Sequence, residues 1–244
     1  LVVLVDGHDV VGELDGEVAW MDLPVALEDI ERIEVVRGPA SAVYGANARC
    51  DAIQVADAAA ALKGASVLLA QQEIPLDTTF AVMRVAKGKG VTVILDPAPA
   101  RQHPDAHRGF LQACDILTPN QTEAEALTGV PVNDVTSAKR AASAIRRSGV
   151  PGVIIKMGEL GAYVHAAGVS RHFPAFKVPV VATVGAGDAF NGGLAAGLAE
   201  GASFEDAVWL AMATGAMSVT KPGAQESMPG RAEVEELLRS QWQR

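Results

Sequence analysis

Short apolar runs alternate with longer amphipathic stretches from about Ile53 to the end of the chain, and this alternation limits the folds open to it. The runs have the length of buried strands, and the stretches between them have the spacing of helices with one apolar face. We predict strands at 66–70, 91–95, 115–117 and 152–156, and helices at 76–87, within 118–127 and at 135–148. Strands that alternate with helices in this way form a mainly parallel sheet with helices on both faces. The pattern therefore predicts an α/β fold.

The last third of the chain adds a hairpin and three helices to this prediction. The segments 162–165 and 169–173 have strand patterns and are separated by a short Gly-containing turn. Helices are predicted at 186–200, 203–220 and 231–241. The Ala-rich stretches at 194–199 and 211–216 indicate close packing of helices and do not have the pattern of a membrane or partner surface.

Acidic residues are concentrated at the beginning of the chain. Residues 1–48 hold ten Asp and Glu residues and two Arg residues, so they carry −8 of the net charge of −9. The nearly neutral remainder has no basic stripe, so nucleic acid is not an expected partner. Two cysteines, no secretory signal and no apolar run of membrane-spanning length indicate a cytoplasmic protein with no membrane partner.

The segment 183–192 carries the sharpest chemical pattern. Small residues precede a predicted helix, so backbone N–H groups and the helix dipole can favour an anion at Gly185, Ala186 and Gly187. Asp188 would lie beside that anion and could accept the proton of a substrate hydroxyl. The alternative is an ordinary helix start with an acidic first turn.

A second candidate cluster follows the strand predicted at 115–117. Asn120 and Glu123 are one helical turn apart, and ligands bind beyond the carboxyl ends of parallel strands. An amide and a carboxylate suit a hydrated Mg²⁺ that carries nucleotide phosphates. The alternative is an N-capped surface helix.

A third cluster, Lys221–Gln225, follows a helix rich in small residues. It could surround a flat base or a monovalent cation. By itself it is also typical of a helix that ends at a glycine.

Together these segments resemble the PfkB carbohydrate kinase family and its ribokinase-like members. The matching segments occur in the family's order at 45–48, 72–75, 96–100, 118–125, 154–161, 185–188 and 223–225. The resemblance implies a three-layer ribokinase-like α/β fold and ATP-dependent phosphorylation of a small sugar, with ribose the first candidate. It implies that Asp188 is the base and contacts the sugar, that Gly185, Ala186 and Gly187 form the anion hole, and that Asn120 and Glu123 organise Mg²⁺ and phosphate. It further implies a sugar contact at Glu73 and nucleotide contacts at Lys156, Gly158, Gly223 and Ala224.

Three positions depart from the family pattern: Ala182, Lys156, and Met212, which stands where a His or Asn often lies near the adenine. The resemblance places a monovalent cation such as K⁺ beside Val184, Gly223 and Ser227, but Ala182 replaces the aspartate that helps to hold it in the family. Lys156 stands where ribokinases often have threonine. The implied cofactors are therefore ATP and Mg²⁺, while a K⁺ requirement is weakened by Ala182.

Residues 1–48 resemble a different family, the plug domain of TonB-dependent receptors. The resemblance is carried by Val3–Gly7, by Leu23-Pro24 and by the long stretch 28–48. The tetrapeptide at 45–48 fits both families, and the kinase family's own N-terminal region is not visible. We therefore expect a chimera, joined by recombination or by sequence assembly, with a plug-like part at 1–44 and an N-terminally truncated kinase domain at 45–244.

A parallel sheet without its first strands would have an uncovered edge. We therefore expect poor solubility or a homodimer, unless Leu1–Val5 and Ile33–Val36 pair with the sheet. The other expected partners are a small sugar and ATP. Two alternative functions remain: an inactive product that retains only nucleotide or phosphate binding, and a plug fragment of an outer-membrane receptor, which the absence of alternating barrel segments disfavours.

Overall fold

The computed structural model describes residues 58, 60–73, 76–99 and 108–241, together with the backbone of residues 2–4 and 34–36. The tetrapeptide at 45–48, which both resemblances share, lies outside the described residues. The chain divides into two compact units, and from Glu34 onward the division falls after Ala175. Unit 1 holds the sheet and helices α3 to α6, and unit 2 holds helices α7 to α9.

The sheet of unit 1 has its strands in sequence order. The described strands are β1 (Val2–Leu4), β2 (Glu34–Val36), β3 (Val67–Ala70), β4 (Thr92–Leu95), β5 (Ile116–Leu117), β6 (Val153–Lys156), β7 (Ala162–Ala166) and β8 (Val169–Phe173), and the sheet order is β1 to β8. Strands β2 to β6 are parallel, and β7 and β8 add an antiparallel hairpin. The predicted α/β class with a mainly parallel sheet is confirmed.

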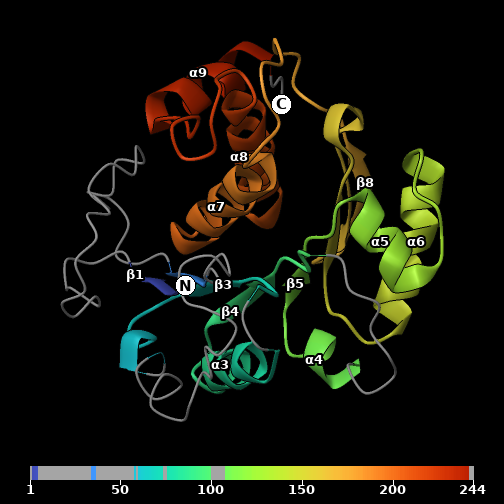
Figure 1. Cartoon of the computed structure of the whole chain (residues 1–244), viewed down its shortest axis with the longest axis vertical. Helices are drawn as coiled ribbons and strands as arrows, with labels where there is room; N and C mark the ends of the chain where they lie inside the picture. Colours follow the sequence, from blue (N-terminus) through green and yellow to red (C-terminus); the bar gives the residue numbers. More distant parts are fainter. Residues whose placement is uncertain are drawn as a thin grey trace. The chain divides into compact units, whose positions relative to one another are not determined.

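The connecting helices of unit 1 pack on one face of this sheet. They are α3 (Leu76–Gly88), α4 (Arg108–Gln112), α5 (Gln121–Thr128) and α6 (Val135–Arg147), with α5 and α6 side by side in Figure 1. Right-handed crossovers between strands that follow in sequence order place their helices on the same face. Leu68, Val93 and Ile155 accordingly form one core cluster with Met83 of α3 and Ala141 of α6. The five-residue α4 was not predicted, because it is too short to show a helical period.

Strand β2 covers the edge of β3. Glu34–Val36 pairs in parallel with Leu68–Ala70, so the exception that we allowed for residues 33–36 is present. We expected a homodimer because the edge of the sheet would be uncovered. Since β2 covers β3, that argument for a homodimer does not apply at β3.

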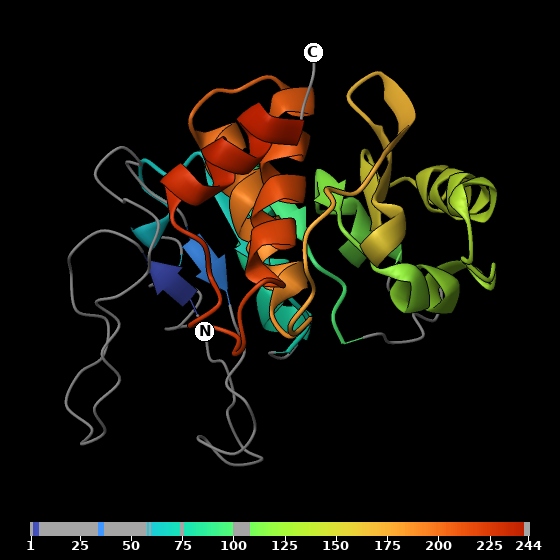
Figure 2. The same cartoon turned by 90° about the horizontal axis from the view of Figure 1, so that it is seen from above.

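Helices α7 (Ala186–Ala199) and α8 (Phe204–Ser218) pack closely within unit 2 (Figure 2). A Cβ atom added at Gly193 would lie 2.6 Å from Oγ1 of Thr214, and one added at Gly197 would lie 2.9 Å from Cα of Ala207. The predicted role of the Ala-rich stretches in close helix packing is thus confirmed. Among the helices that the structure describes, none is long and apolar enough to cross a membrane.

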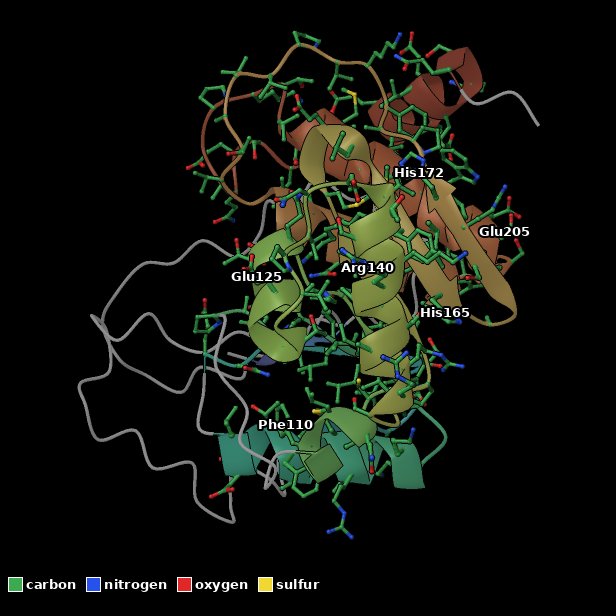
Figure 3. All side chains as sticks on the ribbon, turned by 90° about the vertical axis from the view of Figure 1, so that its right-hand side faces the viewer. Phe110, Glu125, Arg140, His165, His172 and Glu205 are labelled. Atoms are coloured by element: carbon green, nitrogen blue, oxygen red, sulfur yellow. The ribbon has the colours of Figure 1, made fainter. Side chains whose placement is uncertain are left out.

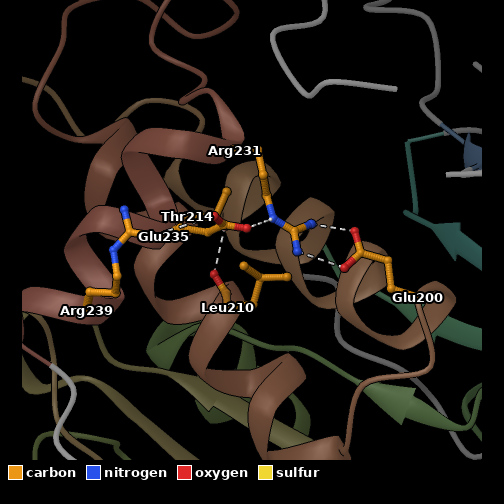
Figure 4. Close-up of polar contacts among 6 residues, drawn as sticks. All are labelled: Glu200, Leu210, Thr214, Arg231, Glu235 and Arg239. Carbon is orange, nitrogen blue, oxygen red and sulfur yellow. Dashed lines mark hydrogen bonds and ion pairs between the residues drawn. The ribbon is translucent and has the colours of Figure 1, made fainter. Parts of the chain in front are cut away.

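An ion-pair network ties α9 (Arg231–Gln241) to the end of α7 (Figure 4). The guanidinium group of Arg231 donates to both carboxylate oxygens of Glu200, and its Nε donates to Oε1 of Glu235 at 2.9 Å. These hydrogen bonds, first of all the one to Glu200, raise the pKa of Arg231 above its ordinary value. Such bidentate contacts fix orientation as well as charge.

Several charged and histidine side chains of α5, α6 and the β7–β8 hairpin are not among the predicted site residues. Figure 3 shows Glu125 on α5, Arg140 on α6, and His165 and His172 on the β7–β8 hairpin. Burial and the nearby Arg146 and Lys139 lower the pKa of His165. The described residues contain no group of three or more His, Cys, Asp or Glu side chains that could hold a metal.

Candidate active site

The predicted site residues of unit 1 lie at the carboxyl ends of its parallel strands. Asn120 follows β5, Lys156 ends β6, and Glu73 comes shortly after β3. Gln72 donates its backbone N–H to the carbonyl of Ala98 at 2.9 Å, which ties the segment after β3 to the segment after β4. This edge is where ligands bind in open α/β sheets.

Asn120 and Glu123 contact each other through a capping box. The Asn120 side chain accepts the Glu123 N–H at 2.9 Å, and the Glu123 carboxylate accepts the Asn120 backbone N–H and side-chain amide at 2.8 Å each. Asn120 is exposed and Glu123 is 6% exposed. The N-cap expected under the alternative interpretation is therefore present, and it also presents two oxygen-bearing side chains at the edge of the sheet.

Burial raises the pKa of Glu123 above its ordinary value, and the neighbouring charge of Asp96 adds to this effect. The hydrogen bond from the Asn120 N–H and the charge of Lys156 act in the opposite direction. Glu123 is therefore part of a cluster with Asp96 and Lys156, not an isolated helix cap.

Lys156 forms a buried ion pair with Asp96. The distance from Nζ of Lys156 to Oδ2 of Asp96 is 2.8 Å, and their side chains are 13% and 4% exposed. The sequence pattern predicted Lys156 as a site residue but did not predict Asp96. The available signal was an aspartate directly after the buried strand at 91–95, at the end where ligands bind.

This donor set fits a hydrated Mg²⁺ better than a metal enclosed by protein ligands. Mg²⁺ keeps several waters and is held by one or two carboxylates together with substrate phosphates. The exposed Asn120 and the carboxylate of Glu123 offer that small number of oxygens. These two residues would hold the ion through its water shell.

Glu73 and Gly158 lie open at the same edge. Glu73 is exposed, in keeping with the predicted sugar contact. Gly158 begins a short 3₁₀ helix, Gly158–Leu160, with a φ of 57°, and a Cβ atom added there would meet nothing within 4 Å. Both residues are therefore accessible from outside unit 1.

The start of α7 in unit 2 carries the residues that we predicted for an anion site. Gly185 is the N-cap residue in a left-handed conformation with a φ of 80°, and none of the described side chains caps the helix. Asp188 is partly buried in the first turn, where the helix dipole favours a negative charge. The Ala186 N–H donates to the Thr183 carbonyl at 3.2 Å, so an anion would share or replace that long hydrogen bond.

The loop after α8 lies against this helix start. A Cβ atom added at Gly185 would be 3.3 Å from the carbonyl oxygen of Ala224. Gly223 has a φ of 91°, which favours glycine, and the buried Ser227 donates its hydroxyl to the Ala224 carbonyl at 2.9 Å. The packing thus brings Gly185 next to the loop that holds Gly223, Ala224 and Ser227, although this loop lies far along the chain from Gly185.

The predicted K⁺ ligands are less well supported by this arrangement. Val184 is 65% exposed, and Ala182 supplies no side-chain oxygen and donates its N–H to Val219 at 3.3 Å. The hydroxyl of Ser227 is used within the loop. The carboxylate that would give such a site its charge is absent at position 182.

The predicted residues therefore form two groups, one in each unit. Glu73, Asn120, Glu123, Lys156 and Gly158 belong to unit 1. The residues predicted at 184–188 and 223–227 belong to unit 2.

Two family models match the chain. The model described as pfkB family carbohydrate kinase matches residues 28–231, and the TonB-dependent receptor plug domain matches residues 1–49. Both matches agree with the resemblances inferred from the sequence.

Relatives of known function match the larger part. A ribokinase from Haemophilus influenzae is 42% identical over 194 residues, which cover 80% of this chain and 62% of the relative. A deoxyribokinase from Salmonella typhi is 35% identical over 196 residues, which cover 80% of this chain and 63% of the relative. The structure of Arabidopsis thaliana ribokinase complexed with ribose and ATP superimposes with a TM-score of 0.67 at 34% identity and covers 75% of this chain and 59% of that one. The chain thus spans about three fifths of the length of these relatives.

Proposed function

Because the chain belongs to the pfkB family of carbohydrate kinases, we propose that it transfers the γ-phosphoryl group of ATP to a hydroxyl group of a small sugar, with ribose as the first candidate. The structural observation that supports this most directly is the start of α7. There Asp188 lies in the first turn of a helix that no described side chain caps. A carboxylate that can accept a proton and helix N–H groups that can face an anion both assist phosphoryl transfer to a hydroxyl.

In the proposed reaction, Asp188 accepts the proton of the attacking sugar hydroxyl. The hydroxyl oxygen forms a bond to the γ-phosphorus while the bond from that phosphorus to the bridging oxygen breaks, and ADP leaves. The N–H groups at Gly185–Gly187 stabilise the negative charge of the phosphoryl group during transfer. The helix dipole of α7 adds to that stabilisation.

Unit 1 contributes the binding of nucleotide and sugar in this proposal. Asn120 and Glu123 orient the hydrated cation of the nucleotide, Lys156 binds a phosphate oxygen, and Glu73 accepts a hydrogen bond from the sugar. Bound Mg²⁺ supplies positive charge that offsets the charge of the phosphates. Gly158 of unit 1 provides backbone surface for the nucleotide, and the family resemblance also implies nucleotide contacts at Gly223 and Ala224 of unit 2. Consumption of ATP is consistent with the cytoplasmic location that we propose.

A coupled assay for ADP release tests the reaction with ribose, 2-deoxyribose and fructose. Asp188→Asn should lower kcat by about 10²- to 10⁴-fold, because it removes the general base. Asp206→Asn is the matched control, since Asp206 also lies in the first turn of a helix of unit 2 and has no proposed role. Turnover that survives in Asp188→Asn at the rate of the control would refute the assigned base.

A second candidate function is nucleotide binding without turnover. It is supported by the predicted nucleotide and phosphate residues of unit 1, where Asn120 contacts Glu123 and pairs with Lys156. Binding of ADP with no phosphorylation of any of the three sugars would support this function and would refute the kinase proposal.

We also propose that residues 1–44 and 45–244 have separate origins. The overlap of the two family matches at 28–49 and the concentration of acidic residues in 1–48 support this division. Long-read sequencing of the source locus tests it. An intact kinase reading frame upstream of Gly45 would refute a genuine fusion.

A further inference from the structure

The ion pair between Asp96 and Lys156 crosses the end of a strand. Asp96 directly follows β4, Lys156 is the last residue of β6, and β5 lies between these two strands. Neighbouring strands are about 4.8 Å apart, so the backbones of β4 and β6 are roughly 10 Å apart. The Nζ–Oδ2 distance of 2.8 Å therefore requires the Lys156 side chain to extend across the carboxyl end of β5.

Lys156 is held at both its backbone and its ammonium group. Its N–H donates to the Pro119 carbonyl at 2.8 Å, and its backbone pairs with Asn120 in an isolated parallel bridge. Its side chain is 13% exposed. The ammonium group is thus fixed next to the start of α5, where Asn120 and Glu123 lie.

Lys87 and Asp115 provide a contrast within the same unit. They form an ion pair of similar length, 2.6 Å, but their side chains are 37% and 34% exposed. An exposed pair of this kind is screened by water and contributes little to stability. A buried pair such as Asp96–Lys156 must overcome the desolvation of two charges, and stability by itself rarely explains one.

The charges around Lys156 indicate what it can bind. The buried carboxylates of Asp96 and Glu123 lie near a single ammonium group, and the charge of Asp96 adds to the burial that raises the pKa of Glu123. A bare phosphate would be repelled by the two carboxylates. A phosphate that carries a hydrated divalent cation meets complementary charges, because the cation faces the carboxylate of Glu123 and a phosphate oxygen faces the ammonium group.

We propose that Asp96 is a positioning residue: its carboxylate holds the Lys156 ammonium group across the end of β5, where Lys156 binds a phosphate oxygen of the Mg²⁺-bound nucleotide. This inference rests on the proposed function, which requires a nucleotide. A lysine on a flexible stem loses conformational entropy when it binds. Asp96 removes that cost by ordering the side chain before the nucleotide arrives.

The test uses the full-length chain and calorimetric titration with a non-hydrolysable ATP analogue in the presence of Mg²⁺. Lys156→Met should weaken binding about tenfold, which corresponds to about 1.4 kcal/mol. Asp96→Asn should weaken binding to a similar extent, and the double variant should bind no more weakly than Lys156→Met. Lys156→Arg, which keeps the charge, should recover part of the affinity.

The exposed pair supplies matched controls. Lys87→Met and Asp115→Asn remove the same chemical groups from the same unit and should leave nucleotide affinity within about twofold of the unchanged chain. Unfolding midpoints of all variants identify any that fail to fold. Lys156→Arg retains both charges and keeps the proposal testable if Asp96→Asn does not fold.

Two results would overturn the proposal. Unchanged nucleotide affinity in folded Asp96→Asn would mean that Asp96 has only a structural role. Tighter binding in Asp96→Asn would mean that Asp96 competes with the phosphate for Lys156 and does not position it.

The outcome is distinct from that of the kinase assay. Binding that depends on Asp96, without sugar phosphorylation, would refute the proposed reaction and leave this inference standing. Sugar phosphorylation with a nucleotide KM that is unchanged in Asp96→Asn would support the proposed reaction and refute this inference. No binding of the Mg²⁺-bound analogue by the unchanged chain would overturn the inference.

Discussion

Replacement of Gly193 by alanine should separate α7 from α8, and its cost can be worked out from the structure. The new Cβ atom would lie 2.6 Å from Oγ1 of Thr214, 2.9 Å from Cβ of Thr214 and 3.0 Å from Cα of Ala211. The Thr214 hydroxyl is not free to turn away without loss, because it donates to the Leu210 carbonyl at 2.7 Å. The Ala211 contact is to backbone, so the helices themselves must shift.

Two effects of opposite sign determine how much Gly193→Ala changes the free energy of unfolding. Overpacking of a tight interface costs about 1–3 kcal/mol. Alanine is a better helix former than glycine by about 1 kcal/mol, which offsets part of that cost. Gly192→Ala distinguishes the overpacking cost from the helix-propensity gain. Gly192 is the adjacent residue of α7, and a Cβ atom there would meet nothing within 4 Å. The helix-propensity gain is common to both variants and cancels in their comparison.

We therefore expect Gly193→Ala to be less stable than Gly192→Ala by about 1–3 kcal/mol. For a chain of this size, each kcal/mol corresponds to about 2–4 °C in Tm. Urea and thermal unfolding followed by far-UV circular dichroism measure the difference. Equal stability of the two variants would show that α7 and α8 do not approach as closely as the structure indicates, and the packing argument would then fail.

Three further predictions concern single groups. Hydrogen bonds from Lys221, and then from the Gly230 N–H, lower the pKa of Glu233, so their stabilising effect is present above the ordinary carboxyl pKa and is lost as the pH falls through the lowered value. Lys221→Met should therefore reduce the unfolding midpoint at pH 7 and have progressively less effect in acid, and a pH-independent loss would contradict this assignment. Burial raises the pKa of Cys114 to about 12, so this thiol should react with maleimide only after urea unfolds the protein. Mass spectrometry locates the labelled cysteine, and fast labelling of Cys114 in the native state would argue against its burial. Since Ala182 supplies no carboxylate, exchange of K⁺ for Na⁺ should change the rate of sugar phosphorylation by less than about twofold, and a strong dependence on K⁺ would show that a monovalent site forms without that carboxylate.

Most elements of the fold could be predicted because their signals are local. A run of buried apolar residues is visible in any short window of sequence, so strands β3 to β6 could be predicted closely. The structure has them at 67–70, 92–95, 116–117 and 153–156, and each begins one residue after its predicted start. Local signals also predicted α6. Its boundaries follow from its apolar period and from Gly149, which comes shortly after its end. The helix α4 has five residues and therefore no period to detect.

The candidate site was predicted in part for the same reason. Gly185 and Asp188 are neighbours in sequence, so the sequence alone places an acid in the first turn of a helix that begins with small residues. Asn120 and Glu123 are one turn apart, and their capping box is a local structure. The position of Asp96 directly after a strand is a local signal, but its ion pair with Lys156 was not predicted, because the two residues are 60 positions apart.

The sequence by itself determined the α/β class and the resemblance to two families, and it supplied the residues that we predict to carry the chemistry. It could do so because apolar periodicity, turn residues and short motifs are set by neighbours along the chain. The tertiary structure decided which of these residues meet. The parallel order of β4, β5 and β6 places Asp96 within reach of Lys156, and the close approach of α7 and α8 requires Gly193. These contacts depend on strand order and helix packing, which join residues that are distant in sequence and therefore leave no local pattern.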